Sequence, residues 1–274
     1  MAKLRIGVIC SLGSEGPRQI IQKASDLGLT GAQLCCWDPT LYSDDWAAET
    51  VKASREFNVE INTLWAGGPG KTVWNFYEGP VTIGIVPQEL RQQRIASLKA
   101  GGDFARKIGT RSITTHVGFI PEDPNDALYE QVVASLKDVA GYCKEIGLEF
   151  WFETGQETPI TLLRTIEDVG TGNLGINLDP ANLILYGKAN PVDALDVFGR
   201  YVRGVHAKDG LYPTNGRELG KEVPLGQGKV NFGTLIPRLK SLDFEGHLTI
   251  EREISGPQQI EDIKSAVELL EPLC

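Results

Sequence analysis

The sequence has no long hydrophobic run. No stretch approaches the roughly 18 apolar residues that a membrane-spanning helix needs. The N-terminal MAKLRIGVIC contains too short an apolar run for a secretory signal peptide. We therefore expect neither a membrane protein nor a secreted one, and we predict a cytoplasmic location.

The sequence also lacks a cysteine motif for disulfides or metal binding, and it lacks an excess of positive charge. The five cysteines, at positions 10, 35, 36, 143 and 274, show no CxxC spacing and no even framework, so we expect buried free thiols. Lysine and arginine number 27 against 36 aspartates and glutamates, which gives a net charge of −9. Because phosphate neutralisation dominates nucleic-acid binding, this balance argues against a nucleic-acid partner.

What the chain does contain is a repeated unit of helix, glycine and strand. The segments SDLGLTGAQLCCW, RKIGTRSITTHVG and KEIGLEFWFETG place Gly28, Gly109 and Gly147 where a helix needs a left-handed last residue. We predict strands near residues 3–10, 31–37, 60–66, 111–117, 148–154, 174–180, 202–208 and 246–252. Eight strand–helix repeats in 274 residues indicate an α/β protein with one domain, a closed (β/α)₈ barrel over residues 1–274. An open doubly wound sheet is the alternative, but no GxGxxG turn follows the first strand.

Two connections are longer than the usual loop of about 2–6 residues. Residues 66–87 are rich in glycine and aromatic residues and contain no convincing helix, and residues 209–230 combine turn residues with Arg217, Lys221 and Lys229. Both follow strands and are expected at the C-terminal mouth of the barrel, where such enzymes build their sites. The aromatic residues of the first loop favour a lid or a subunit contact, so a homo-oligomer is permitted without being required.

Polar residues gather at the ends of four strands. Side chains alternate between the two faces of a strand, so Glu153, Asp179, His206 and Glu251 fall on the faces opposite the apolar sets of LEFWFET, LGINLDP, RGVHAKD and HLTIERE. We expect the apolar sets to face the helices and these four residues to meet at the mouth. Three carboxylates in a partly dry site would repel one another unless a cation were present. Oxygen ligands with one imidazole suit one divalent cation, Mn²⁺, Mg²⁺ or Co²⁺, with Zn²⁺ also permitted.

The strand-end motifs resemble a known family. FET at 152–154, NLDPAN at 177–182, VHAKDG at 205–210, PLGQGKVNF at 224–232 and TIERE at 249–253 look like the xylose-isomerase-like TIM barrel superfamily of sugar phosphate isomerases and epimerases. The resemblance, which is to the ketose 3-epimerases in particular, implies that Glu153, Asp179, His206 and Glu251 bind one cation, commonly Mn²⁺. It also implies that Glu153 and Glu251 act as the acid and base on either side of an enediolate.

Other residues near the mouth are candidates for substrate binding: His116, Glu157, Asn182, Lys208, Lys221, Trp37 and Trp65. Each has a structural alternative. His116 can be a core residue, Glu157 can cap the helix near Pro159, and Lys208 can form a salt bridge. Lys221 resembles the place of a substrate-binding arginine, and the two tryptophans can form an apolar wall for a sugar or belong to the core. Asn182 stands where the superfamily often has histidine, which favours one metal over a cluster.

Several functions share these features. We favour a metal-dependent sugar or sugar phosphate isomerase or epimerase, with an inosose-type dehydratase as the nearest alternative. A DNA-repair endonuclease is disfavoured by the acidic charge and by the DxxN in place of DxxH, and a non-catalytic sugar-binding barrel is disfavoured by the complete set of four ligands. No GxxxxGK loop is present, and GQG at 226–228 is too short to indicate phosphate binding.

Overall fold

The computed structural model describes residues 3–274, and each predicted helix–glycine–strand unit is found in it. Gly28, Gly109 and Gly147 end their helices with φ values of 76°, 81° and 80°, which is left-handed backbone as expected. The eight predicted strands all form, with ends that differ by a few residues from the prediction. They are β1 (Arg5–Leu12), β2 (Gly31–Cys36), β3 (Glu60–Ala66), β4 (Ser112–Thr115), β5 (Glu149–Glu153), β6 (Leu174–Leu178), β7 (Val202–Ala207) and β10 (His247–Ile250).

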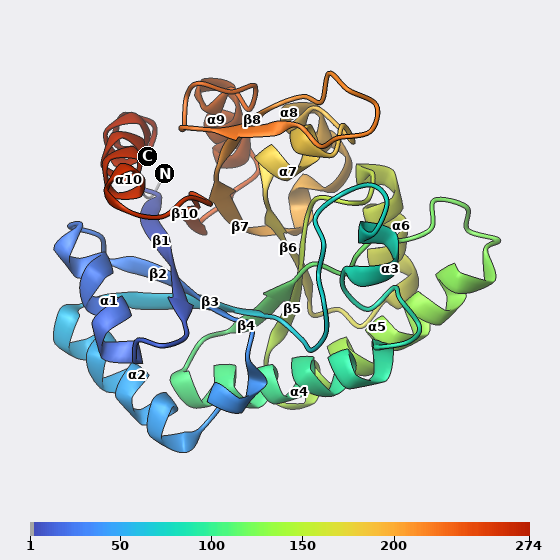
Figure 1. Ribbon diagram of the computed structural model, residues 1–274, viewed down its shortest axis with the longest axis horizontal. Helices are drawn as coiled ribbons and strands as arrows, with labels where there is room; N and C mark the ends of the chain where they lie inside the picture. Colours follow the sequence, from blue (N-terminus) through green and yellow to red (C-terminus); the bar gives the residue numbers. More distant parts are fainter. Residues whose placement is uncertain (1–2) are drawn as a thin grey trace.

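These eight strands close into one parallel barrel, in the order β1-β10-β7-β6-β5-β4-β3-β2 (Figure 1). The first strand pairs with both β2 and β10, which excludes the open sheet. The strands are surrounded by α1 (Pro17–Asp26), α2 (Asp44–Phe57), α4 (Arg91–Ile108), α5 (Ala127–Glu145), α6 (Pro159–Val169), α8 (Pro191–Phe198), α9 (Phe232–Ser241) and α10 (Pro257–Leu270). Shorter elements are α3 (Gly79–Thr82), α7 (Pro180–Leu185), η1 (Pro39–Leu41), η2 (Gly199–Tyr201) and η3 (Glu271–Leu273). The fold is therefore a single-domain TIM barrel.

The apolar core lies between the strands and the helices. The barrel interior near the N-terminal ends of the strands is polar. Leu34, Phe150 and Ile176 are fully buried on the outer side of the strands. Inside, Asn62 donates a hydrogen bond to Thr249 across the barrel, at 3.0 Å, and a cavity of about 390 Å³ opens toward the N-terminal ends of the strands. Buried donors on Gln33 and Asn177 have no protein partner there. Burial of apolar surface in the outer layer must therefore supply most of the stability.

The two long connections are more ordered than the sequence indicates. Residues 66–87 contain the single turn α3, and residues 209–230, predicted as a loop, contain the antiparallel hairpin of β8 (Asp209–Leu211) and β9 (Lys221–Val223). The prediction missed this hairpin because the turn residues between the strands hide any alternation.

Asp209 organises the second connection. Its buried carboxylate accepts hydrogen bonds from the backbone N–H groups of Gly210, Gly226, Gly228 and Val230, at 2.9, 2.9, 3.0 and 3.1 Å. A β-carbon at position 228 would come within 2.0 Å of this carboxylate, so the close approach requires glycine. The carboxylate thus fixes both ends of the segment that follows β7.

All five cysteines are free, and three of them are buried. None of the helices in residues 3–274 is long and apolar enough to cross a membrane.

We predict that Asp209→Ala lowers the free energy of unfolding by about 3 kcal/mol, because four N–H groups lose a charged acceptor and those of Gly210 and Val230 are left buried without a partner. Urea denaturation followed by circular dichroism measures this. Asp26→Ala is the control, since Asp26 is exposed and its replacement should change stability by less than about 0.5 kcal/mol. Equal effects of the two substitutions would show that Asp209 does not organise the loop.

Candidate metal centre

Four neighbouring strands bring the predicted acidic and imidazole side chains together. Glu153 is the last residue of β5, Asp179 directly follows β6, His206 lies in β7 and Glu251 directly follows β10. These strands are adjacent in the barrel, so side chains of the same parity meet at the mouth. One ligand atom from each of the four residues lies within 4.8 Å of all the others.

His206 stands at the centre of this cluster. Its Nδ1 atom lies 3.1 Å from Glu153 Oε1, 3.7 Å from Asp179 Oδ2 and 3.0 Å from Glu251 Oε2. None of these contacts to Nδ1 has the geometry of a hydrogen bond, and His206 Nδ1, Asp179 Oδ2 and Glu251 Oε2 are buried without a hydrogen-bond partner. Buried polar atoms that converge without pairing have the geometry expected of a binding site for an ion.

The second oxygen of Asp179 and the second ring nitrogen of His206 are hydrogen-bonded to other parts of the protein. Asp179 Oδ1 accepts a hydrogen bond from the backbone N–H of Asn182 at 2.8 Å and so caps α7, which leaves Oδ2 for the cluster. His206 Nε2 lies 3.1 Å from the amide oxygen of Gln33. With the Gln33 amide in this orientation its oxygen accepts from Nε2–H, and Nδ1 is the ring atom that faces the carboxylates and can bind a cation.

The electrostatics favour a cation in this position. Burial would lower the pKa of His206, but the charges of Glu153 and Glu251 raise that pKa well above its ordinary value. Burial would raise the pKa of Glu251, yet Lys208 and His206 lower it to about 2. The carboxylates therefore hold an imidazolium among them, and a divalent cation would provide the same compensation with better ligand geometry. Three carboxylates and one imidazole are ligands that suit such an ion, so these four residues fit a divalent cation.

Lys208, one layer above His206, adds a second positive charge. The residue is 2 % exposed, and its Nζ atom lies 2.6 Å from Glu253 Oε1, 3.4 Å from Glu251 Oε2 and 3.6 Å from Asp179 Oδ2. Burial would lower the pKa of Lys208, but the carboxylates of Glu251 and Asp179 raise it well above its ordinary value. Lys208 is therefore a fixed ammonium group in a salt-bridge network at the mouth.

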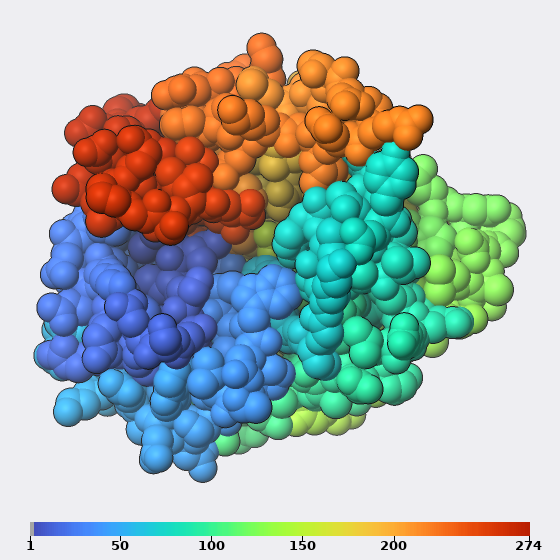
Figure 2. All heavy atoms as spheres, in the orientation of Figure 1, coloured from blue at the N-terminus to red at the C-terminus, as the bar shows by residue number. Residues whose placement is uncertain are grey.

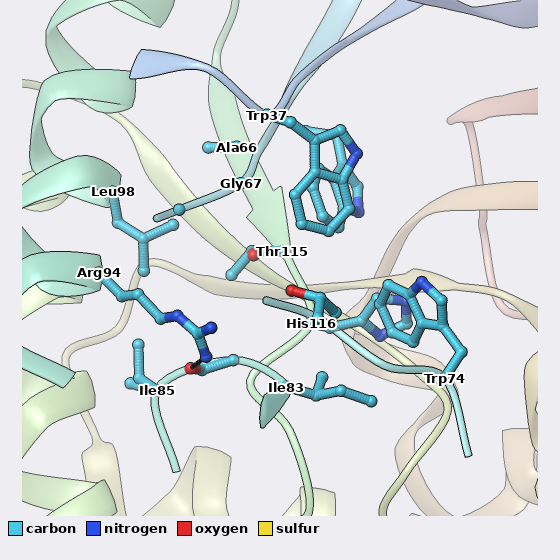
Figure 3. A pocket seen from close by; sticks show the side chains of 14 residues that line it. Trp37, Ala66, Gly67, Trp74, Ile83, Ile85, Arg94, Leu98, Thr115 and His116 are labelled. Atoms are coloured by element: carbon cyan, nitrogen blue, oxygen red, sulfur yellow. Dashed lines mark hydrogen bonds between the residues drawn. The ribbon is translucent and has the colours of Figure 1, made fainter. Parts of the chain in front are cut away.

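An aromatic wall stands on the opposite side of the cluster. Trp37 and Trp65 lie with ring centroids 4.6 Å apart, and Figure 3 shows Trp74 beside His116, whose ring centroids are 5.0 Å apart. Trp65 Nε1 donates a hydrogen bond to Glu153 Oε2, and His116 Nε2 lies 3.3 Å from Glu153 Oε1. The wall therefore orients the carboxylate of Glu153 and also offers apolar faces to a ligand.

The other predicted residues are placed less favourably. Glu157 is buried, and burial raises its pKa to about 7. The alternative that it caps the following helix is wrong, because the hydroxyl of Thr158 caps α6. Asn182 is buried with Oδ1 3.4 Å from Lys208 Nζ, whereas Lys221 is exposed in β9 and does not line the cavity at the mouth. Substrate contacts from these three residues stay predictions.

The sequence reasoning missed three residues of this site. Gln33 holds the ring of His206, Glu253 pairs with Lys208, and Trp74 joins the aromatic wall from a loop predicted to form a lid or a subunit contact. The alternation rule applied to GAQLCCW would have found Gln33, since it has the opposite parity to the buried Leu34. The sequence indicated only that the aromatic residues of this loop form a lid or a subunit contact, because the place of Trp74 depends on the path of a long loop.

The site opens into a deep cavity. Its volume is about 910 Å³, and its inner end is formed by Glu153, Glu251, His116 and the tryptophans. Figure 2 shows a hollow with the blue N-terminal and red C-terminal segments on one side and the cyan segment that follows β3 on the other. A small molecule can therefore reach the carboxylates from outside.

Comparisons with known proteins agree with this fold. The crystal structure of a xylose isomerase domain protein from Planctomyces limnophilus has 35 % sequence identity and a TM-score of 0.90, and the match covers 99 % of this chain and 96 % of that one. A D-psicose 3-epimerase structure, determined in the presence of D-fructose, has 16 % identity and a TM-score of 0.72, with 98 % and 99 % covered. A Mycobacterium smegmatis protein in complex with magnesium also has 16 % identity and a TM-score of 0.72, with 100 % and 99 % covered.

Other similar structures carry the names of epimerases and of a probable dehydratase, at 16–19 % identity, and at that distance they show the fold alone. A curated relative, the uncharacterized protein MJ1311 of Methanocaldococcus jannaschii, is 23 % identical over 177 residues, which are 61 % of this chain and 59 % of that protein. The matched part of the chain thus covers less than two thirds of the length of that protein.

The family model for the xylose isomerase-like TIM barrel matches residues 21–273. Since the match covers nearly the whole barrel, including all four strands of the cluster, the chain belongs to the xylose isomerase-like TIM barrel family.

Proposed function

We propose that this protein is a divalent-metal-dependent sugar isomerase or epimerase that works through an enediolate. The observation that carries the proposal is the cluster of Glu153, Asp179, His206 and Glu251, with three buried ligand atoms that no protein group satisfies. Structural relatives named as sugar epimerases support the reaction class. Mn²⁺ is the cation we favour, and Mg²⁺, Co²⁺ and Zn²⁺ suit the same ligands.

The two glutamates are placed for proton transfer at different positions on a substrate. When bound, the cation polarises a substrate carbonyl and so makes the adjacent C–H more acidic. Glu153 and Glu251 come from strands separated by β6 and β7, so they approach the cluster from different sides. One carboxylate removes a proton, and the other returns one to the opposite face, which gives epimerisation, or to the neighbouring carbon, which gives isomerisation.

Neighbouring residues orient these two carboxylates and the substrate. Trp65 and His116 hold Glu153, and Lys208 lies against Glu251. The Lys208 ammonium can also stabilise negative charge on a substrate oxygen. The aromatic faces of Trp37 and Trp74 can pack against the C–H groups of a sugar ring and exclude water from it.

A dehydratase acting by similar enolisation is the second candidate. The specific observation is His116, which lines the cavity with Nε2 3.3 Å from Glu153 Oε1. Burial would lower the pKa of His116, but the charge of Glu153 raises it, and an imidazolium beside a carboxylate base can protonate a departing hydroxyl group. A structural relative is named as a probable 3-DHS dehydratase. Loss of water from the product distinguishes this reaction from epimerisation.

We predict that the protein binds one Mn²⁺ ion with release of about one proton, because His206 must lose its Nδ1 proton to become a ligand. The raised pKa of His206 sets the sign: as the pH falls through that pKa, protonation competes with the ion and affinity falls. The loss should begin above the ordinary histidine pKa of about 6.5. Calorimetric titration in two buffers of different ionisation enthalpy measures both quantities.

The matched variants for this experiment are His206→Gln and His247→Gln. His206 lies in the cluster, whereas His247 begins β10 at the opposite end of the barrel. We expect binding to disappear only in the first variant. Tight binding without proton release, or equal loss in both variants, would contradict the assignment of His206.

We predict that the Mn²⁺-loaded protein exchanges the hydrogen beside the carbonyl of a ketose or keto-sugar with solvent deuterium. Glu251→Gln should lower the exchange rate at least roughly 100-fold, the usual contribution of a general base. Glu149→Gln is the control, since Glu149 lies at the other end of β5 and accepts a hydrogen bond from Trp151. Mass spectrometry over a panel of sugars measures the exchange, and no exchange with any of them would refute the proposed function.

A further inference from the structure

The barrel interior contains a second cavity near the N-terminal ends of the strands, here called the N-terminal cavity. Its volume is about 390 Å³, which lies in the range of about 300–1,000 Å³ for small-molecule sites. Among residues 3–274, no residue lines both this cavity and the one at the mouth. TIM barrels usually fill this part of the interior with layers of branched apolar side chains. An open polar space at this place therefore needs an explanation.

Glycines keep the N-terminal cavity open. Three large side chains of its wall each lie against a glycine of another strand: His247 against Gly31, Trp151 against Gly175 and Asn177 against Gly204. A β-carbon on any of these glycines would come within 2.8 Å of the side chain that it faces, so each close approach requires glycine. The large side chains can therefore lie along the barrel wall, and the space around the barrel axis stays free.

Four polar atoms in the wall are buried without a hydrogen-bond partner among the described residues. They are Gln33 Nε2, Asn62 Oδ1, Asn177 Nδ2 and His247 Nε2. Burial and the charge of Arg5 lower the pKa of His247 to about 4, so its ring is neutral at pH 7. The set thus contains amide donors, a carbonyl acceptor and a neutral imidazole. An apolar ligand would leave them unsatisfied, whereas a hydroxyl group both donates and accepts and can pair with each.

The charges around the cavity balance. Among the described residues, its wall contains four arginines and four acidic residues: Arg5, Arg111, Arg200 and Arg203 with Glu60, Glu149, Asp243 and Glu245. A ligand with a net charge of either sign therefore meets as much like charge as opposite charge. The indole N–H of Trp151 is already bonded to Glu149 at 2.6 Å, so its ring offers the cavity an apolar surface.

We propose that the N-terminal cavity is a second small-molecule site, which binds an uncharged polyhydroxylated molecule about the size of a monosaccharide. Its hydroxyl groups pair with the amides of Gln33, Asn62 and Asn177, and its C–H groups pack against Trp151. The cavity has room for about a dozen water molecules of ~30 Å³ each, and such a ligand can replace them and reproduce their hydrogen bonds. The site rests on these residues and not on the reaction proposed for the mouth.

The three histidines of the chain allow the two ends of the barrel to be followed separately by NMR of the imidazole groups. His247 lines the N-terminal cavity, whereas His116 and His206 contact Glu153 at the mouth. The Mg²⁺-loaded full chain, which is diamagnetic, is titrated at pH 7 with myo-inositol, D-glucitol and methyl β-D-glucopyranoside. None of these has a carbonyl that could enolise. We expect at least one of them to shift the His247 signals in a saturable way, with His247→Gln assigning those signals.

Glucuronate and glucosamine are the charged probes. Each should bind the N-terminal cavity at least about tenfold more weakly than the tightest of the three polyols, since one buried group left without a partner has an effect of this size. No shift of His247 with any polyol would show that the cavity holds water alone and would overturn the proposal. Shifts confined to His116 and His206, or tighter binding of a charged probe at His247, would overturn it as well.

The matched variants are Asn177→Leu and Thr114→Val. Each replaces a buried side chain that has an unpaired polar atom with an apolar one of similar size, so both variants should fold and keep Mg²⁺ binding at the mouth. Only Asn177 lines the N-terminal cavity. We expect Asn177→Leu alone to weaken polyol binding at least about tenfold. Equal effects of the two substitutions, or no effect of either, would contradict the assignment of the site.

Discussion

The repulsion between three carboxylates held at one barrel mouth is the constraint around which the site is built. Glu153, Asp179 and Glu251 are carried by strands that cannot separate, because each strand is paired on both sides. The protein offsets their charge with a central imidazole and a buried ammonium. One oxygen each of Glu153 and Asp179 also accepts a hydrogen bond, from Trp65 and from the backbone N–H of Asn182. His206 Nδ1, Asp179 Oδ2 and Glu251 Oε2 still converge without hydrogen-bond partners. A divalent ion would offset their charge better than a single side chain can.

Much of the fold and of this cluster follows from two simple periodicities. Left-handed glycines mark the helix ends, and alternation along each strand separates Glu153 from the fully buried Phe152 beside it. Parallel strands in a closed barrel then have their carboxyl ends at the same rim, so parity alone brings distant residues together. Even the choice of Asp179 and its partner Asn182 can be understood locally, since one oxygen of Asp179 starts a helix while the other faces the cluster.

What could not be predicted depends on contacts between segments without periodicity. Trp74 reaches His116 from a connection whose path is set by the residues it happens to pack against. Glu253 meets Lys208 only because the chain turns after β10, and the β8–β9 hairpin forms where the sequence shows mainly turn residues. The family resemblance supplied a reaction class but not a substrate, because substrate contacts come from these irregular segments.

The anchoring of residues 209–230 by Asp209 also bears on how molecules enter and leave. Four hydrogen bonds to one buried carboxylate attach this segment to the end of β7, so it moves with the barrel as a fixed wall. The aromatic segment after β3 is anchored as well. Asn75 Oδ1 accepts hydrogen bonds from three backbone N–H groups, and the buried Arg94 donates to the carbonyl oxygens of Pro69, Lys71 and Gly84. Both connections at the mouth are therefore tied to the barrel, so a ligand meets a largely preformed rim and binding need not order either connection first.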